Sequence, residues 1–458
     1  MTVPPERPAS PVQQPGGAGH LTPPVRSSPV PDVFDPRGYA RGLPHAAYRR
    51  LRDHHPVAWQ EEPAVLGWPA GPGFWAVTRH RDVVRVLKDS RTFSSYLGGT
   101  QIRDPDPADL PFLRRMMLNQ DPSPGSPGGS GRAGPHDHGR LRRLVSRAFT
   151  PGRVGRFGAV VRARARGLLT AAVGTARAGG GGECDLVATV TDDYALLNLA
   201  DLLGVPAGER GLLLDWTRRV IGYQDPDEAG PPVSGPDGRP ADPRSPAMLR
   251  DMFGFAHELA AHKRRHPADD VMTMLAHDPE LTAPELEMFF FLLTIAGNDT
   301  VRSAAPGGLL TLAGHPAAYR TLRAGVLAGT AELGPCVEEL LRRHPPVLSF
   351  RRTAAYGTEL AGRRIAAGDK VVVFHGSANY DERVFTAPHR LDLARSPNPH
   401  VSFGDGPHIC LGAHLARLQL RLFYEETARL LPALSLAAPP RHLVSNFING
   451  VKSLRLRV

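Results

Sequence analysis

The sequence predicts a mainly helical protein with a smaller β-rich part. The clearest observation is a helical pattern from Ala283 to about Ala313, which begins with a capping box formed by Thr282 and Glu285 and ends before Pro316. At 1.5 Å per residue, such a helix is about 46 Å long, enough to cross a whole domain. A second helical pattern runs from about Leu411 to Leu431. Strand patterns are fewer and shorter.

The β-rich part is expected in two regions of the chain. Val57–Gln60 and Phe74–Thr78 alternate around a Gly/Pro turn and predict a hairpin, and Lys370–Phe374 predicts a further strand. Shorter helices are expected at 48–55, before the hairpin, and at 82–88, 138–149 and 336–343, between the two regions.

The first 32 residues are rich in Pro, Gly and Ser and are expected to form a disordered tail. They lack the basic-then-apolar order of a signal peptide. Two further Pro/Gly-rich stretches, 123–135 and 226–246, predict surface loops. No internal repeat interrupts the remainder, so residues 33–458 are expected to form a single catalytic domain.

Composition narrows the class of protein. Hydrophobic residues make up 41% of the 458 residues and charged residues 22%, which is typical of a globular protein. The absence of an apolar run of about 18 residues predicts no membrane span. Three scattered cysteines favour a reducing, cytoplasmic location. The net charge of +10 suits an acidic protein partner, and without a nucleic-acid motif we expect no nucleic acid to bind.

The segment from Phe403 to Gly412 surrounds one cysteine, Cys410, with glycines and a proline. Glycines at such density indicate a tight turn that brings main chain close to a neighbour. Because Cys410 stands just before a helix, free N–H groups and the helix dipole would stabilise its thiolate, which is a good ligand for iron. A buried structural cysteine is the alternative interpretation.

The long helical pattern contains a polar interruption at 296–300, Ala-Gly-Asn-Asp-Thr. These residues are mostly poor helix formers, and polar groups inside a buried helix cost stability unless they are bonded. They indicate either a groove for water and a small ligand or a kink with a satisfied polar pair. Further along, Pro306 removes one helical hydrogen bond and is expected to kink the helix.

Both segments resemble motifs of the cytochrome P450 family, and their order along the chain is the same. The resemblance implies the P450 fold and one haem b, with Cys410 as the axial ligand of the haem iron. It also implies that Thr300 holds dioxygen and water, that Asp299 relays protons, and that Ala296 and Gly297 leave room for dioxygen.

The same resemblance assigns charged residues to two structural tasks. Glu339 and Arg342, three residues apart on one helix, would form a buried charge network with Arg390. A surface ion pair is what a bare E-x-x-R pattern indicates by itself.

Four basic residues would bind the haem propionates by resemblance: His138, Arg142, Arg352 and His408. Arg351 and His136 are weaker candidates. The remaining arginines of the 138–149 helix, at 140, 143 and 147, form either a solvated face or a docking site for an acidic electron donor.

The resemblance therefore implies a haem-dependent monooxygenase that inserts one oxygen atom from O2 into an apolar small molecule. Asn298 and the segment 445–450 favour steroid, terpenoid, polyketide or fatty-chain substrates from natural-product or lipid metabolism. Substrate contacts are expected at 96–103, 216–224, 291–296, 347–350 and 446–448. Electrons would come from a ferredoxin and its reductase. Coupling, ring closure, nitration or desaturation on the same fold, a peroxide-driven reaction and a non-enzymatic haem-binding sensor are the alternatives.

Overall fold

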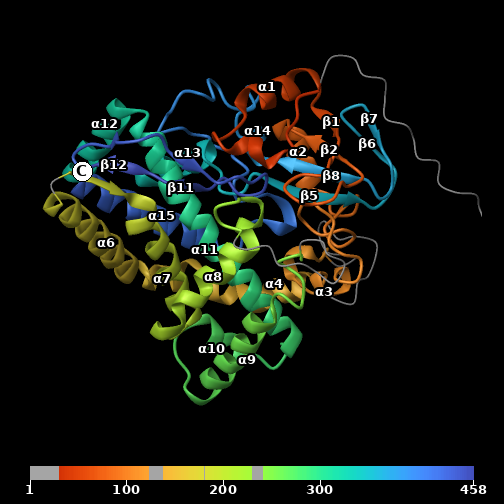
Figure 1. Ribbon diagram of the computed structural model, residues 1–458, viewed down its shortest axis with the longest axis horizontal. Helices are drawn as coiled ribbons and strands as arrows, with labels where there is room; N and C mark the ends of the chain where they lie inside the picture. Colours follow the sequence, from red (N-terminus) through yellow and green to blue (C-terminus); the bar gives the residue numbers. More distant parts are fainter. Residues whose placement is uncertain (1–29, 123–137, 180, 230–240) are drawn as a thin grey trace, which may run out of the picture.

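The computed structural model describes residues 30–122, 138–179, 181–229 and 241–458 (Figure 1). Most of the expected N-terminal tail, the loop at 123–135, His136 and the centre of the loop at 226–246 lie outside the described residues. The described chain is mainly helical, and its small sheets lie in separate parts of the molecule (Figure 1). The predicted fold class is confirmed.

The helix α11 (Ala283–Ala313) runs through the centre of the molecule (Figure 1). Its bounds agree with the sequence, and Thr282 and Glu285 form the predicted capping box. The helix continues through Pro306, which is buried, so the helical pattern is not interrupted there. Its N-terminal half packs against α8 (Arg210–Ile221) and α9 (Arg250–Arg265).

The C-terminal half of α11 belongs to a second hydrophobic core with α6 (Gly158–Ala178), α7 (Asp192–Leu203), α12 (Pro316–Ala328), α13 (Leu333–Arg343) and α15 (Ala413–Leu430). α15 lies along α6 and contacts α11 (Figure 1). The last predicted helix thus begins two residues later than expected, after Cys410 and Gly412. The smaller helices are α1 (His45–His54), α2 (His80–Lys88), α3 (Leu110–Leu113), α4 (His138–Ser146), α5 (Pro151–Arg156), α10 (Val271–Ala276) and α14 (His375–Ala378).

A mixed five-stranded sheet forms the β-rich part, in the order β1-β2-β8-β5-β3. β1 (Val57–Gln60) and β2 (Phe74–Val77) form the predicted antiparallel hairpin, and β8 (Lys370–Phe374) pairs in parallel with β2. β5 (Ser349–Ala354) and β3 (Phe93–Ser94) complete the sheet. Separate hydrophobic clusters cover its two faces.

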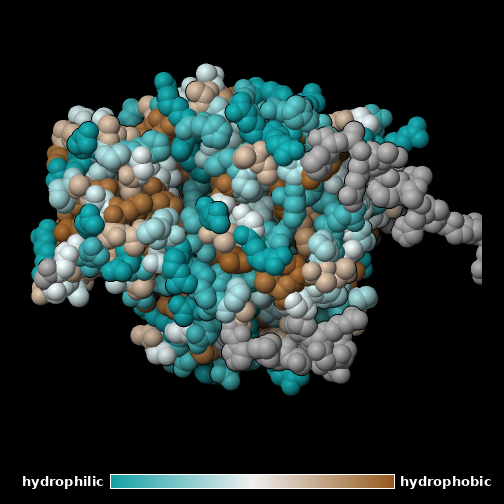
Figure 2. Space-filling model, turned by 45° about the horizontal axis from the view of Figure 1, so that its top comes forward, coloured by the Kyte–Doolittle hydropathy of each residue, from teal (hydrophilic) through white to brown (hydrophobic). Residues whose placement is uncertain are grey.

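Short strands outside this sheet fasten the C-terminus and one surface hairpin. β4 (Glu183–Asp185), β12 (Arg455–Arg457) and β9 (Ser435–Leu436) form a three-stranded sheet, and two two-stranded sheets consist of β6 (Thr358–Leu360) with β7 (Arg363–Ile365) and of β10 (Arg441–His442) with β11 (Val451–Ser453). On the face shown in Figure 2, hydrophobic residues form separate patches between hydrophilic ones. Within the described ranges, no helix has the length and hydrophobicity needed to cross a membrane.

Candidate active site

The loop before α15 holds Cys410 in a closed turn. The Cys410 N–H donates to the Phe403 carbonyl at 2.8 Å. Gly404 and Gly406 have φ angles of 71° and 69°, in the left-handed region that glycine tolerates. A Cβ at Gly406 would lie 2.6 Å from the Leu87 carbonyl oxygen at the end of α2. The predicted close approach of main chain is therefore an approach of this loop to α2.

The surroundings of Cys410 act on its thiol in opposite directions. Desolvation by nearby protein atoms raises the pKa of Cys410, while the Gly412 N–H and the positive charges of Arg142 and Arg417 lower it. The side chain itself is exposed, in contrast to the buried Cys184 and Cys336. Cys410 is thus the accessible cysteine, and it has donors that stabilise a thiolate.

The middle of α11 presents a hydroxyl and a carboxyl near one cavity. The Thr300 hydroxyl donates to the Ala296 carbonyl at 2.7 Å, one turn earlier. Ala296, Asp299 and Thr300 all line the cavity. Because Ala296 and Thr300 are four residues apart, they share one face of the helix.

Asp299 is 3% exposed, and its Oδ2 has no hydrogen-bond partner in the described structure. Burial raises the pKa of Asp299 to about 6, although Arg302, 3.7 Å away, lowers it. Arg302 in turn binds Asp192 at 2.7 Å. A carboxyl with a pKa near neutrality can exchange protons at physiological pH, which suits proton relay.

Two neighbouring residues in this motif contact other helices. A Cβ at Gly297 would lie 2.7 Å from Leu199 Cδ1 of α7. Gly297 therefore permits close helix packing, and the expectation that it makes room for dioxygen is wrong. The buried Asn298 donates to the Thr217 hydroxyl of α8 at 3.2 Å. Ala296 is the small residue that faces the cavity.

The four basic residues predicted for the haem propionates come from three parts of the fold. The rings of His138, at the start of α4, and His408 lie 4.4 Å apart. Arg142 lies one turn further along α4. Burial, with the nearby charges of Arg352, His138 and Arg142, lowers the pKa of His408 well below its usual value. The charged Arg142 and Arg352, with the rings of His138 and His408 beside them, form a cluster that favours a negatively charged ligand.

Arg352 tests whether this cluster of basic residues fits a haem propionate. It is 2% exposed, and burial lowers its pKa to about 10. It donates to the Arg351 carbonyl, yet no described carboxylate lies within ion-pair distance of it. A buried cation without a counterion is costly, and a propionate would supply one. Arg351 differs because Asp104 already binds it at 2.5 Å. The cluster therefore fits haem.

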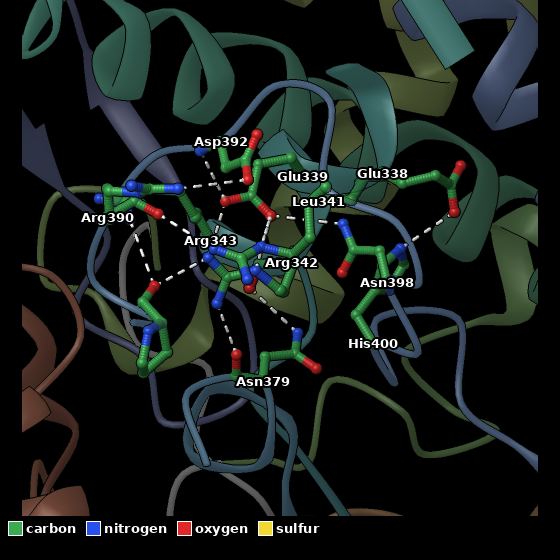
Figure 3. Close-up of polar contacts among 12 residues, drawn as sticks. Glu338, Glu339, Leu341, Arg342, Arg343, Asn379, Arg390, Asp392, Asn398 and His400 are labelled. Carbon is green, nitrogen blue, oxygen red and sulfur yellow. Dashed lines mark hydrogen bonds and ion pairs between the residues drawn. The ribbon is translucent and has the colours of Figure 1, made fainter. Parts of the chain in front are cut away.

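A buried charge network is centred on two residues of α13 (Figure 3). Glu339 accepts from Arg342 Nε at 2.7 Å, and both side chains are fully buried. The third member is Arg395, whose Nε donates to Glu339 Oε2 at 3.0 Å. The prediction for Arg390 is wrong: its side chain is 75% exposed and lies 3.7 Å from Asp392.

The backbone explains why Arg395, and not Arg390, binds Glu339. Arg390 closes a turn in which its N–H donates to the Ala387 carbonyl, and its own carbonyl accepts from Arg395 Nη2 at 3.3 Å. The turn directs the Arg390 guanidinium outward, whereas Arg395 reaches inward. Asn398 also donates to Glu339, at 3.3 Å. No local pattern in the sequence separates the two arginines.

A cavity lies on the Ala296–Thr300 face of α11. Its empty space is about 830 Å³, part of which is open to solvent, and apolar side chains form most of its walls. Each of the five regions predicted to contact substrate contributes to the lining, through Gly98–Arg103, Val220–Ile221, Phe291–Leu292 with Ile295–Ala296, Val347 with Phe350, and Phe447–Ile448. Sequence reasoning missed Arg244, which also lines the cavity.

Comparison with known proteins agrees with this geometry. The family model for cytochrome P450 matches residues 252–441. The steroid C26-monooxygenase of Mycobacterium tuberculosis is 35% identical over 433 residues, which cover 92% of this chain and 91% of that protein. The methyl-branched lipid omega-hydroxylase of the same organism is 35% identical over 415 residues, or 89% of each chain.

Solved structures show the same fold. A cytochrome P450 from Mycobacterium marinum in complex with pseudoionone has a TM-score of 0.78 and 34% identity, covering 95% of this chain and all of that one. A Bacillus megaterium protein in complex with testosterone has a TM-score of 0.72 and 25% identity, covering 91% of this chain and 98% of that one. Sequence identity over nearly the whole length, together with the cysteine loop and the α11 motif, shows that the chain belongs to the cytochrome P450 family and is a haem-dependent monooxygenase.

Proposed function

We propose that this monooxygenase hydroxylates an end carbon of an extended apolar molecule, such as a steroid side chain or a methyl-branched lipid. The observation that carries this proposal is the largely apolar cavity that reaches Ala296 and Thr300. Its relatives are named for oxidation of steroid carbon 26 and of the omega position of a lipid. Both names describe attack at the end of a hydrocarbon chain.

Haem, when bound, supplies dioxygen activation and transfer of one oxygen atom to carbon. We assign Cys410 as its axial ligand, because this exposed thiol has Gly412, Arg142 and Arg417 to stabilise negative charge. His138, Arg142, Arg352 and His408 would hold the propionates. The network of Glu339, Arg342 and Arg395 fixes α13 against the segment that leads to the Cys410 loop.

The proton path that we propose begins at Asp299. Its carboxyl, with a pKa near 6, can take up a proton from solvent and release it toward the cavity. Arg302, which also binds Asp192 of α7, attracts this carboxyl from the side of α7. The Thr300 hydroxyl, on the cavity face, donates to the Ala296 carbonyl and orients water in the cavity by accepting a hydrogen bond from it. Ala296 keeps the space beside it free of a larger side chain.

The family takes electrons from separate redox proteins, and we propose a ferredoxin with its reductase for this member. Exposed arginines without a carboxylate partner in the described structure include Arg143 on α4, Arg147 directly after α4 and Arg421 on α15. Arg140 is not among them, because it binds Glu285. A hollow at α15 is lined by His414, Arg417 and Arg421. An acidic ferredoxin would complement this charge.

The experiment uses the holoenzyme with a ferredoxin, its reductase and a reduced nicotinamide donor under isotopically labelled dioxygen. A steroid with an alkyl side chain and a methyl-branched lipid serve as substrates, and mass spectrometry follows the products. We expect one labelled oxygen atom on an end carbon. Label that is absent from the product, or oxidation confined to ring carbons, would contradict the proposal.

A further inference from the structure

Two arginines at one side of the cavity share a single carboxylate. Arg103 Nη2 lies 2.9 Å from Asp242 Oδ2. Arg244 binds the same carboxylate through two atoms, Nε to Oδ1 at 2.9 Å and Nη2 to Oδ2 at 2.8 Å. The side chains of Arg103, Arg244 and Asp242 are 17%, 9% and 11% exposed. Two largely buried cations thus face one anion.

The two arginines differ in how fully they are bonded. Arg244 also donates from Nη1 to Gln101 Oε1 at 2.5 Å, so it has an acceptor on each nitrogen. The buried Nε of Arg103 has no hydrogen-bond partner in the described structure. Burial lowers the pKa of Arg103 even though Asp242 raises it. Arg103 is therefore the cation with binding capacity left over.

Aromatic rings hold the guanidinium of Arg103 in place. Its Cζ lies 3.5 Å from the centre of the Trp68 ring and 5.4 Å from that of Tyr223. The two rings meet edge to face, 5.5 Å apart. A guanidinium fixed in this way loses little conformational freedom when it binds a ligand, and its planar donors suit a carboxylate.

The surplus of positive charge is local. In the adjoining network, two cations, Arg351 and Lys370, bind two carboxylates, Glu62 and Asp104. That network is balanced. Asp109 attracts Arg244 from outside ion-pair distance and is partly exposed, so water screens it.

Arg103 lines both the cavity and an adjoining hollow. Ala296 and Thr300 line the main cavity with Arg103. Trp68 and Tyr223 line the adjoining hollow with Arg103, and neither Ala296 nor Thr300 belongs to that hollow. Apolar residues such as Phe291, Ile295 and Phe350 form walls of the main cavity. One molecule could therefore place a charged end at Arg103 and its hydrocarbon along these walls.

We propose that the substrate carries a carboxylate that binds Arg103, with its apolar chain directed toward Thr300. This inference rests on the proposed function and adds that the substrate is an apolar acid, oxidised at the end farthest from the carboxylate. A neutral ketone or alcohol could accept a hydrogen bond from Arg103, but it would leave the positive charge uncompensated.

The test compares acids with their methyl esters as ligands of the ferric holoenzyme. The probes are decanoate, dodecanoate, tetradecanoate and hexadecanoate with the matching esters, and the shift of the Soret band gives each dissociation constant. The proteins are the wild type, Arg103→Gln, Arg103→Lys and Arg115→Gln. Arg115 is the matched control, because it is exposed and its side chain has no ion-pair partner in the described chain.

The wild type should bind at least one acid about tenfold or more tighter than its ester, the effect of one charge-assisted hydrogen bond at a buried site. Arg103→Gln should remove this preference by weakening acid binding much more than ester binding, and Arg103→Lys should restore part of it. Arg115→Gln should match the wild type. The oxidised carbon of the acid should be at or next to its methyl end.

Three results would overturn the inference. Equal binding of acids and esters by the wild type would show that charge is not recognised. Equal weakening of acids and esters in Arg103→Gln would make Arg103 a structural residue. Equal loss in Arg115→Gln would indicate general surface attraction. In each case, the proposed monooxygenase function would stand as long as esters still bind and are oxidised. If no apolar probe, testosterone included, shifts the Soret band, both the inference and the proposed function would be contradicted.

Discussion

Asp299→Asn should change how the stability of the protein depends on pH. Burial raises the pKa of Asp299 from 3.8 to about 6. Between these values the folded state holds a proton that the unfolded state has released, so stability falls as pH rises. One pKa unit corresponds to about 1.4 kcal/mol, so burying Asp299 costs roughly 1–2 kcal/mol at about pH 5, where its folded carboxyl is mainly protonated, and about 3 kcal/mol at about pH 8, where it is ionised.

The amide that this substitution introduces cannot ionise, so the variant avoids this cost. The free energy of unfolding of Asp299→Asn, relative to the wild type, should therefore rise by roughly 1–2 kcal/mol between about pH 5 and about pH 8. Urea unfolding of the ferric holoenzyme, with refolding as the check, measures the difference. Asp193→Asn, at an exposed position on α7, is the control. Parallel profiles for wild type and Asp299→Asn would refute a buried, proton-exchanging Asp299.

Three further predictions concern the network, the hydroxyl and the glycines. Arg395→Gln should lower the free energy of unfolding by about 1–3 kcal/mol because it removes a buried bond to Glu339, and Arg390→Gln should change it by less than about 0.5 kcal/mol; equal effects in thermal melts would contradict the assignment. Thr300→Ala should reduce product formed per electron consumed by about tenfold or more, whereas Thr311→Ala, which loses a similar bond to the carbonyl one turn earlier, should not. Gly406→Ala should cost more than about 2 kcal/mol because its Cβ meets the Leu87 backbone at positive φ, while Gly297→Ala should cost less because the end of Leu199 can move. The reverse order in unfolding experiments would show that the Cys410 loop does not rest on α2.

The elements with strong local signals could be predicted from the sequence. The bounds of α11 follow from a capping box and a terminal glycine, and the β1–β2 hairpin follows from two alternating runs around a turn. The sequence pattern places the start of α15 two residues early, because Leu411 fits the apolar period although Gly412 caps the helix. Helix ends depend on backbone geometry that composition does not determine.

Some residues of the site could likewise be predicted from the sequence, and others could not. The Cys410 loop and the Ala296–Thr300 motif are contiguous in sequence, so a resemblance to family motifs could single them out. Arg395 could not be distinguished from Arg390, because a turn decides which guanidinium points inward. The packing of Gly297 against Leu199 depends on where α7 lies.

The charge imbalance at the cavity was also beyond local sequence reasoning. Arg103, Asp242 and Arg244 come from two segments more than a hundred residues apart, and only their contact shows that two cations share one anion. Trp68 and Tyr223 come from two further segments. Contacts between distant segments carry information on substrate charge that family motifs do not contain.

Thiolate ligation by Cys410 is the central claim, and a spectrum tests it most directly. The dithionite-reduced, carbon monoxide-bound wild type should be recorded beside Cys410→Ala and, as the control, Cys336→Ala, whose buried thiol lies on α13. We predict a strongly red-shifted Soret band in the wild type and in Cys336→Ala, and its loss in Cys410→Ala. A red-shifted band that survives in Cys410→Ala, or a wild type that binds no haem, would contradict the account.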